Sequence, residues 1–292
     1  MKKRILVTGS NGFLGKSFIE GFNKNLYDIF ALDFKDKFSG DIQGIKDYFS
    51  VDISKSFNLN MNFDVVIHLA ALNQTNINSD FSYRQFENVN VNGTKNVANC
   101  CKFKKFIFFS TANLYERNEN QVDENSTLKP SSFYERSKYE AELVCKEYID
   151  NEKLVILRPV NVTGVKQENK AIVPFFFSRA VKHESIEIFV PKNKKIQLLS
   201  VRDLLSAIED IICKENATGI FNLSNKDSIE VKTLAEKITT LCNSKSTVTC
   251  TNDNLENYVE ISSDKAKQLL NWQAKDSIDI IIKDFAKTFL SQ

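Results

Sequence analysis

The chain has 292 residues, of which 42% are hydrophobic and 26% charged, and its formal net charge is +2. These values are typical of a globular enzyme with one large domain or two closely joined ones. A net charge this small, without a basic run interleaved with aromatic residues, argues against nucleic acid or an anionic membrane as a partner. No apolar stretch approaches the ~18 residues that span a bilayer. Residues 1–4 lead directly into a strand, so we expect no signal peptide and a cytoplasmic location.

Close to the N-terminus, an apolar strand is followed by a glycine turn and a helix. Residues 5–7 are apolar, glycines stand at positions 9, 12 and 15, and residues 16–20 suit a first helical turn. This order is the one that a pyrophosphate-binding site needs, because the helix N-terminus presents free N–H groups. We expect Gly9 to permit the turn, Gly12 to let the backbone approach phosphates, and Gly15 to let the helix pack on the strand.

Alternating strands and helices follow. Strands are expected over residues 27–33, 49–53, 63–71, 103–109 and 154–157, and helices over 81–101 and 133–149. Asp33 ends the second strand, roughly 20 residues beyond the glycines, where a carboxylate accepts hydrogen bonds from the adenosine ribose. An acid there repels a 2′-phosphate and favours NAD, although Lys35 and Lys37 leave NADP open. We expect His68 to be a packed, hydrogen-bonded strand residue.

Residues with reactive side chains stand at the end of the fifth strand and on the helix after it. Ser110 and Thr111 follow an apolar strand, and ligands bind beyond the carboxyl ends of parallel strands. Tyr134 and Lys138 are four residues apart, so they share one helix face. About one such pair is expected by chance, and its position after the Ser-Thr strand end is what makes it informative.

The C-terminal part has shorter and less regular elements. We expect helices over residues 172–181, 201–213, 231–243, 263–271 and 278–290, with strands over 186–190, 197–200, 219–223 and 248–251. The aromatic run 174–177 suggests that its helix lines a pocket. The predicted fold is α/β: a Rossmann-type doubly wound parallel sheet with a smaller C-terminal substrate-binding lobe. Residues 1–164 would form the NAD-binding domain, with 197–224 returning to it, and residues 165–196 and 225–292 would form the lobe.

Several short motifs, taken in order, resemble those of the extended short-chain dehydrogenase/reductase superfamily, in particular its NAD-dependent epimerase/dehydratase branch acting on nucleotide sugars. They lie at residues 8–15, 33, 52–53, 68–71, 90–94, 110–115, 134–138 and 157–164. The resemblance implies that Tyr134 is the general base, Lys138 its partner, and Thr111 the hydroxyl that binds the reacting oxygen. It implies a homodimer formed through the helices at 81–101 and 133–149.

The resemblance also implies a set of binding residues. Those for the cofactor are Gly9, Asn11, Gly12, Phe13, Leu14, Gly15, Asp33, Asp52, Ile53, Leu69, Ala70, Ala71, Asn90, Ser110, Tyr134, Lys138, Pro159 and Val160. Those for the substrate are Asn113, Asn161 and Lys195. No metal site is expected, because the six cysteines and two histidines fit no zinc spacing.

The sequence departs from the family pattern at three places. Ala112 and Asn113 stand where the dehydratases carry acidic residues, which argues against loss of water. Ile196 stands where an arginine usually reads the nucleotide phosphates, and residues 252–255 lack a second expected arginine. Lys195 could serve as a point charge, without the bidentate geometry of arginine.

Three functions follow from these patterns. The first is an NAD-dependent epimerase of a sugar or nucleotide sugar, which forms a keto intermediate and reduces it again. The second is an NAD(P)H-dependent 4-keto-sugar reductase. The third, a non-catalytic NAD(P)-binding regulator, is disfavoured by the presence of Thr111, Tyr134 and Lys138 together.

Overall fold

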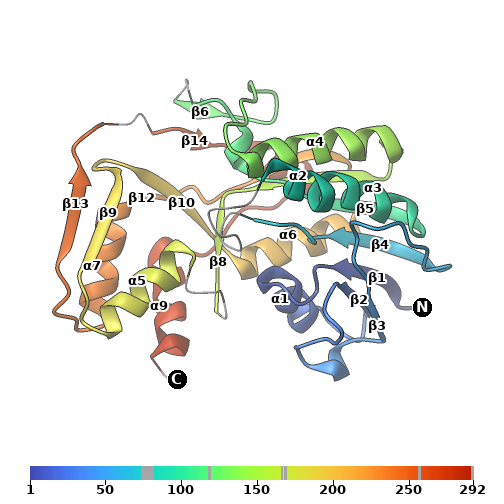
Figure 1. The fold of residues 1–292 in the computed structure, drawn as a ribbon, viewed down its shortest axis with the longest axis horizontal. Helices are drawn as coiled ribbons and strands as arrows, with labels where there is room; N and C mark the ends of the chain where they lie inside the picture. Colours follow the sequence, from blue (N-terminus) through green and yellow to red (C-terminus); the bar gives the residue numbers. More distant parts are fainter. Residues whose placement is uncertain (74–81, 118–119, 166, 168–169, 256–257, 291–292) are drawn as a thin grey trace. The chain divides into compact units, whose positions relative to one another are not determined.

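Two compact units make up the described chain, and each draws on more than one stretch of sequence. The structure is a computed structural model that describes residues 1–73, 82–117, 120–165, 167, 170–255 and 258–290. The first unit comprises residues 1–115, 128–158 and 208–221, and the second comprises 116–127, 159–207 and 222–292. Figure 1 traces the chain through both. Residues 116–127 and 159–164, assigned to the first domain from the sequence, therefore group with the second unit, and of segment 197–224 only 208–221 groups wholly with the first.

A seven-stranded sheet runs through the first unit, in the order β11-β7-β5-β4-β1-β2-β3. The strands are β1 (Lys3–Thr8), β2 (Tyr27–Asp33), β3 (Asp47–Ser50), β4 (Asn62–His68), β5 (Lys102–Phe109), β7 (Leu154–Pro159) and β11 (Gly219–Leu223). Neighbouring pairs from β3 to β7 are parallel, with Val7 opposite both Ala31 and Ile67. The Rossmann-type parallel sheet that the sequence predicts is confirmed.

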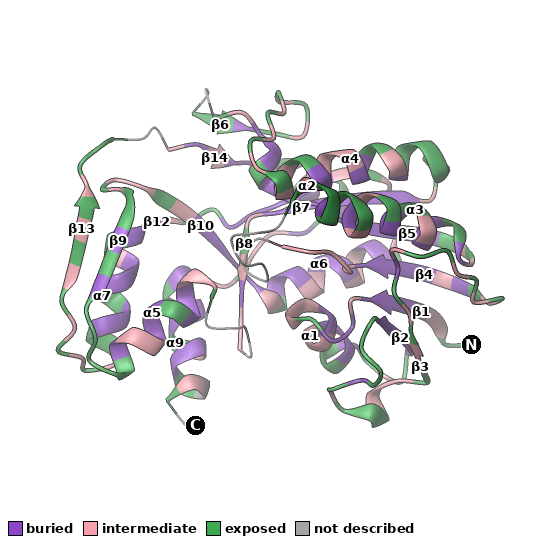
Figure 2. Ribbon diagram, in the orientation of Figure 1, coloured by how far each residue is buried: buried purple, intermediate pink, exposed green. Residues whose placement is uncertain are grey.

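Helices pack on both faces of this sheet. They include α1 (Phe13–Gly21), α3 (Gly93–Asn99) and α4 (Phe133–Tyr148). Val66 and Phe106 belong to a buried cluster with residues of α3 and α4. Phe109 instead meets Phe18 of α1, with ring centroids 5.7 Å apart. Because alternate strand residues point to opposite faces, Phe106 and Phe109 serve different faces, and the strands are buried along most of their length (Figure 2).

The strand order places two chain segments together at one point of the sheet. β2 lies on one side of β1 and β4 lies on the other. The direction in which successive strands are added to the sheet therefore reverses between β1 and β4. Open parallel sheets bind their ligands at such a switch point, beyond the carboxyl ends of the strands. The glycine turn follows β1 here, and residues 69–71 follow β4.

The helical stretch after β4 contains a wider turn. It consists of α2 (Tyr83–Phe86), the π-helical segment η3 (Glu87–Asn92) and α3. The predicted helix over 81–101 is thus present from Tyr83 to Asn99, and Phe81 lies outside the described residues. Single π turns inside longer helices often mark functional sites. This one carries Asn90, whose exposed fraction is 1%.

The second unit contains three small sheets. Their orders are β12-β10-β8, β13-β9 and β14-β6. The strands are β6 (Gln121–Val122), β8 (Asn161–Thr163), β9 (Ile186–Pro191), β10 (Lys195–Ser200), β12 (Ser228–Glu230), β13 (Val248–Asn252) and β14 (Glu260–Ile261). The helices are α5 (Ile172–Val181), α7 (Val231–Leu241), α8 (Asp264–Leu270) and α9 (Ile278–Phe289). Helix α6 (Val201–Cys213) begins in the second unit and ends in the first.

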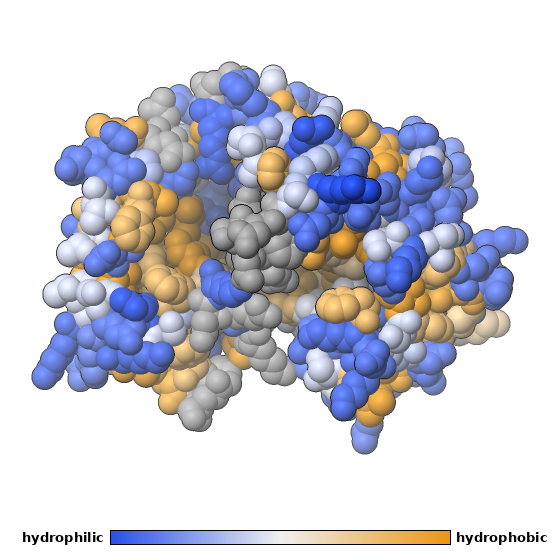
Figure 3. All heavy atoms as spheres, in the orientation of Figure 1, coloured by the Kyte–Doolittle hydropathy of each residue, from blue (hydrophilic) through white to orange (hydrophobic). Residues whose placement is uncertain are grey.

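Two aromatic residues of α5 belong to the core of the second unit. Phe176 and Phe177 pack in one cluster with residues of α7 and α9, and the rings of Phe177 and Phe285 are stacked 5.0 Å apart. The prediction that this run lines a pocket is wrong for these two side chains, because an apolar helix face is stabilised by burial against other helices. Phe175 and Phe189 stay exposed, and hydrophobic residues gather over β9 and α5 in Figure 3.

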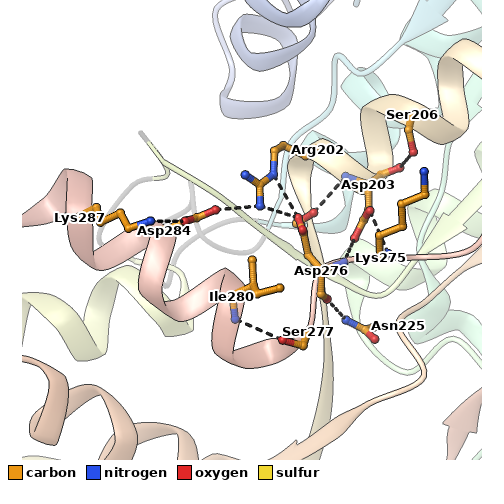
Figure 4. Close-up of polar contacts among 11 residues, drawn as sticks. Arg202, Asp203, Ser206, Asn225, Lys275, Asp276, Ser277, Ile280, Asp284 and Lys287 are labelled. Carbon is orange, nitrogen blue, oxygen red and sulfur yellow. Dashed lines mark hydrogen bonds and ion pairs between the residues drawn. The ribbon is translucent and has the colours of Figure 1, made fainter.

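A polar network fixes the segment before α9 to the start of α6 (Figure 4). The Asp203 carboxylate accepts hydrogen bonds from the backbone N–H groups of Lys275 and Asp276 at 3.1 and 3.0 Å. Trp272 donates its indole N–H to the Asp203 carbonyl at 3.0 Å, and Arg202 pairs with Asp276 at 2.9 Å. The network pairs backbone N–H groups of a loop that no helix or strand pairs.

Most predicted elements have the expected type, and the differences concern their ends and the shortest strands. The third strand, predicted over 49–53, spans Asp47–Ser50, so Asp52 and Ile53 lie in the loop after it. Four short strands were not expected: β6, β8, β12 and β14. Each has two or three residues, and strands this short depend on their partners rather than on their own pattern.

Candidate active site

The glycine turn is shaped partly by its own packing. Gly9 has a φ of +68°, and a Cβ atom there would lie 2.7 Å from the backbone nitrogen of Ala70. A Cβ on Gly15 would lie 2.3 Å from the carbonyl oxygen of Gly9. A Cβ on Gly12 would meet only that same oxygen, at 3.1 Å. Gly9 and Gly15 are therefore required by the turn itself, whereas Gly12 faces a space that a Cβ would partly fill.

Several polar groups around this turn fit a dinucleotide. Helix α1 starts after Gly12 with no side chain capping its first N–H groups and no acidic residue in its first turn. Free N–H groups at a helix N-terminus attract a phosphate. In the described part of the chain, the hydroxyls of Ser10 and Ser110 are buried without a hydrogen-bonding partner. Buried hydroxyls of this kind cost about 1–3 kcal/mol unless a ligand or water pairs with them.

The carboxylate of Asp33 lies at the end of β2, and only 6% of this residue is exposed. One of its oxygens accepts the backbone N–H of Asn11 at 2.9 Å, and the other accepts that of Lys35 at 3.3 Å. A carboxylate can accept about four hydrogen bonds, so capacity is left for a diol such as a ribose. Asp52 is engaged with Ser54 at 2.7 Å, and Ile53 is buried.

His68 links β1 to the helix after β4 through two buried hydrogen bonds. Its Nδ1 lies 2.7 Å from the Thr8 hydroxyl, and its Nε2 lies 3.0 Å from the Thr94 hydroxyl. The Thr94 hydroxyl donates to the Asn90 carbonyl at 2.5 Å, so it must accept its hydrogen bond from Nε2. The neutral imidazole therefore carries its proton on Nε2. Burial, together with the charge of Lys138, lowers the pKa of His68 to about 3. The predicted structural role of His68 is confirmed.

Asn90 joins the segment after β4 to the helix that carries Tyr134. Its side chain exchanges two hydrogen bonds with the backbone of Leu72, at 2.7 and 3.0 Å. Its amide also donates to the Ser137 hydroxyl at 2.8 Å, and that hydroxyl donates to the Tyr134 carbonyl at 2.8 Å. Leu69, Ala70 and Ala71, predicted to bind the cofactor, belong to the segment that this amide fixes.

Thr111 follows β5 and begins a short helical turn, η4 (Ala112–Leu114). Its hydroxyl oxygen accepts the backbone N–H of Asn113 at 3.2 Å, which leaves its hydrogen available to a ligand. Ala112 is buried and Asn113 is exposed. The two positions after Thr111 therefore place no carboxylate beside it.

Helix α4 presents Tyr134, Lys138 and Glu142 at intervals of four residues. The helix begins with a capping box, in which the Ser132 hydroxyl accepts the N–H of Glu135 at 3.1 Å. Burial and the charge of Glu135 raise the pKa of Tyr134 to about 12. Burial lowers the pKa of Lys138 to about 8, although Cys145 and Glu142 act to raise it. In the described chain neither the Tyr134 hydroxyl nor the Lys138 ammonium has a hydrogen-bonding partner.

A buried ion pair fixes α4 one turn beyond Lys138. Arg158 forms a bidentate pair with Glu142, at 2.9 and 2.7 Å, and donates to the Tyr115 hydroxyl at 2.9 Å. Both charged residues are at most 1% exposed. Sequence reasoning gave no role to Glu142 or Ser137. The available signal for Glu142 was a carboxylate one helical turn after Lys138, with an arginine at the end of the next strand.

The remaining predicted binding residues lie in the second unit. Pro159 ends β7, and the N–H of Val160 donates to the Leu223 carbonyl at 3.0 Å. Asn161 starts β8 and donates to the Gln197 carbonyl at 3.4 Å. The Lys195 ammonium lies 5.9 Å from the centre of the Tyr258 ring. Their roles toward cofactor and substrate stay predictions.

Two kinds of feature are absent from the described residues. No group of three or more histidine, cysteine, aspartate or glutamate side chains is arranged to hold a metal ion. No helix within those residues has both the length and the apolar character needed to cross a membrane.

The fold is shared with a solved epimerase. The UDP-glucuronic acid 4-epimerase of Bacillus cereus, determined in complex with UDP-glucuronic acid and NAD, superposes with a TM-score of 0.84. The alignment covers 99% of each chain at 20% identity. Identity this low supports the shared fold alone.

Curated relatives have three different activities. The human dTDP-D-glucose 4,6-dehydratase is 27% identical and aligns with 94% of this chain and 82% of its own length. The dTDP-4-dehydro-6-deoxyglucose reductase of Escherichia coli is 26% identical and aligns with 85% of this chain and 84% of its own length. The ADP-L-glycero-D-manno-heptose-6-epimerase of Brachyspira hyodysenteriae is 29% identical and aligns with 75% of this chain and 74% of its own length.

The family assignment rests on a match to a family model. Residues 5–224, well over half of the chain, match the NAD dependent epimerase/dehydratase family. This range contains the glycine turn, Asp33, Thr111, Tyr134 and Lys138. The chain therefore belongs to the NAD dependent epimerase/dehydratase family, whose members are enzymes of the extended short-chain dehydrogenase/reductase class that use NAD.

Proposed function

We propose that the protein is an NAD-dependent epimerase of a nucleotide sugar. The observation that supports this most directly is α4, which presents the Tyr134 hydroxyl and the Lys138 ammonium on one face, both without a hydrogen-bonding partner among the described residues. The ammonium lies 4.3 Å from the centre of the Phe108 ring. The chemistry that NAD supplies when bound is reversible hydride transfer. Tyr134 would take the proton of a sugar hydroxyl as a hydride leaves the same carbon for NAD. It would return that proton to the oxygen when the hydride comes back to the opposite face of the carbon.

The charge of Lys138 is central to this assignment. A phenol with a pKa of about 12 is a poor base at neutral pH, and a neighbouring positive charge lowers it. Lys138 is protonated at neutral pH even in its buried position, because its pKa is about 8. Thr111, whose hydroxyl hydrogen is free to donate, would hold the sugar oxygen as its proton leaves.

The residues after Thr111 favour epimerisation over dehydration. Loss of water from a sugar needs an acid and a base beside the reacting carbons. Ala112 and Asn113 supply neither. Gly9, Gly12 and Gly15 would hold the pyrophosphate, and Asp33 the ribose, as the uncapped start of α1 and the buried carboxylate support.

A 4-keto-sugar reductase is the second candidate. The E. coli reductase aligns with 85% of this chain and 84% of its own length, so the two chains are similar in extent. The same tyrosine would then donate its proton once, to a ketone that enters from solution. A non-catalytic regulator is the least supported alternative, because it gives no role to the buried Lys138.

Isolation of the protein tests these alternatives. We expect an epimerase to purify with NAD, detected by absorbance and mass spectrometry, and to convert one member of a panel of UDP- and dTDP-sugars without net consumption of cofactor. A reductase would instead oxidise added NADH or NADPH stoichiometrically with a 4-keto sugar nucleotide. Absence of both activities across the panel would contradict both assignments.

Tyr134→Phe provides the residue-level test. We expect turnover to be abolished while NAD binding is retained, because the substitution removes one hydroxyl. Tyr139→Phe, on the same helix, is the matched control and should leave turnover unchanged. Activity that survives in Tyr134→Phe would refute the assignment of the base.

Oligomeric state and substrate residues belong to the same proposal. A homodimer through the helices at 81–101 and 133–149 is supported by the exposed apolar residues of α4, which are Phe133, Leu143 and Tyr148. Asn113, Asn161 and Lys195 remain the proposed substrate contacts, and the proposed location is the cytoplasm.

A further inference from the structure

One residue of the glycine turn uses its whole side chain to hold another part of the protein. The amide of Asn11 donates to the Lys37 carbonyl at 3.2 Å and to the Tyr48 hydroxyl at 3.1 Å. Its carbonyl oxygen accepts from the backbone N–H and from the hydroxyl of Ser39, both at 2.7 Å. An asparagine side chain has two donor hydrogens and two acceptor sites, so Asn11 has no capacity left for a ligand.

Tyr48 extends this contact along the segment after β2. Its hydroxyl donates to the Lys35 carbonyl at 2.5 Å, and its ring lies 6.2 Å from that of the buried Phe38. Asn11 and Tyr48 therefore fix residues 35–39 through their backbone. The carbonyls of Lys35 and Lys37 accept these hydrogen bonds, while both lysine residues are exposed.

The same residue also holds the acid that ends β2. The backbone N–H of Asn11 donates to the Asp33 carboxylate at 2.9 Å, and Asn11 itself is 7% exposed. One position of the turn thus fixes both Asp33 and the two lysines that follow it in sequence. A 2′-phosphate on a ribose bound by Asp33 would meet this carboxylate, which repels it.

We propose that Asn11 is a positioning residue that makes the protein select NAD over NADP, by holding residues 35–39 so that Lys35 and Lys37 cannot pair with a 2′-phosphate. The inference rests on the proposed function, in which Asp33 binds the adenosine ribose. It assigns the discrimination to the backbone of residues 35–39 as well as to Asp33, because Asn11 bonds to the backbone of the segment that carries both lysines.

Binding constants for both dinucleotides test this inference. NAD and NADP are titrated into the nucleotide-free protein by calorimetry, for wild type, Asn11→Ala and Tyr48→Phe. We expect the ratio of the NADP to the NAD dissociation constant to fall about tenfold in Asn11→Ala, which corresponds to about 1.4 kcal/mol. Tyr48→Phe removes the hydroxyl that bonds to Asn11 and to the Lys35 carbonyl. It should also lower the ratio, by a smaller factor.

Two further variants separate positioning from a merely structural role. Asn11→Ala combined with Lys35→Ala and Lys37→Ala should regain the wild-type ratio, because the freed lysines are then absent. Ser17→Ala is the control, since that hydroxyl bonds only to the Phe13 carbonyl within α1, and its ratio should not change.

The contrary outcomes are distinct. A ratio that stays unchanged in Asn11→Ala and Tyr48→Phe, whatever their melting temperatures, would overturn the inference and leave the proposed function intact. If Asn11→Ala does not fold, the ratio measured for Tyr48→Phe decides by itself: a lowered ratio supports the inference, and an unchanged ratio overturns it. A wild-type protein that prefers NADP would also overturn the inference. Binding of neither dinucleotide would overturn the proposed function with it.

Discussion

The side-chain amide of Asn90 lies 2.8 Å from the hydroxyl of Ser137 and joins the π-helical segment η3 to α4. Through this bond, the helix turn that carries Tyr134 is tied to the segment that follows β4. The contact connects residues 47 positions apart in the chain, and both are at most 1% exposed.

Asn90→Ala should destabilise the protein by about 2–4 kcal/mol, because it removes two hydrogen bonds to the backbone of Leu72 and one to the buried Ser137 hydroxyl. The free energy of unfolding is measured by urea denaturation. Asn99→Ala is the matched control: its amide bonds only to the Lys95 carbonyl on an exposed surface, and it should change stability by less than about 0.5 kcal/mol. Equal effects of the two substitutions would show that the buried bond is not important for stability.

Substitutions of two glycines of the turn should have different effects, one on stability and the other on NAD binding. Gly15→Ala brings a Cβ to 2.3 Å from a backbone oxygen, so we expect a loss of stability of about 1–3 kcal/mol or more. Gly12→Ala meets one atom at 3.1 Å, so it should fold and bind NAD at least about tenfold more weakly. Thermal melting and NAD titration check both, with Gly44→Ala as the control, where a Cβ has 3.5 Å to its nearest neighbour. NAD binding by Gly12→Ala at wild-type strength would contradict the role of this position.

Lys138→Met should stabilise the protein at pH 7 while abolishing turnover. The pKa of Lys138 is about 8 in the folded protein against an ordinary value of 10.5, so the buried ammonium costs about 3 kcal/mol below pH 8. That cost disappears as the pH rises from 8 to 10.5, because the unfolded chain then holds the proton that the folded protein has released. The stability of wild type relative to Lys138→Met should therefore rise across this range. A difference that does not vary with pH would show that the folded pKa is not lowered.

His68 should make the protein sensitive to acid. Its pKa is about 3 in the folded protein and 6.5 ordinarily, so stability from the neutral imidazole is complete above pH 6.5 and is lost as the pH falls toward 3. Between pH 7 and pH 5 this group removes about 2 kcal/mol. Wild type should lose that much more stability than His68→Gln over the interval, measured by urea denaturation at both pH values. Parallel losses would mean that His68 is not held neutral.

Local pattern determined much of the fold of this protein. The alternation of apolar strands with amphipathic helices predicted β2, α5, α6 and β11 to the residue, because each is long enough for its hydrophobic period to set its ends. The glycine turn was evident for a similar reason: positive φ and close backbone approach leave a signature in residue type at three neighbouring positions. Asp33, Tyr134 and Lys138 could be selected because each stands at a fixed place relative to such an element.

Only the tertiary structure decided how these residues are held. Asn11 with Ser39, Asn90 with Ser137, and Glu142 with Arg158 are pairs separated by 28, 47 and 16 positions. The strength of such hydrogen bonds and ion pairs comes from burial, which no local pattern encodes, because it arises when distant segments exclude water together. For the same reason the pKa values of His68 and Lys138 depend on the packed interior, although their residue types and positions are visible in the sequence.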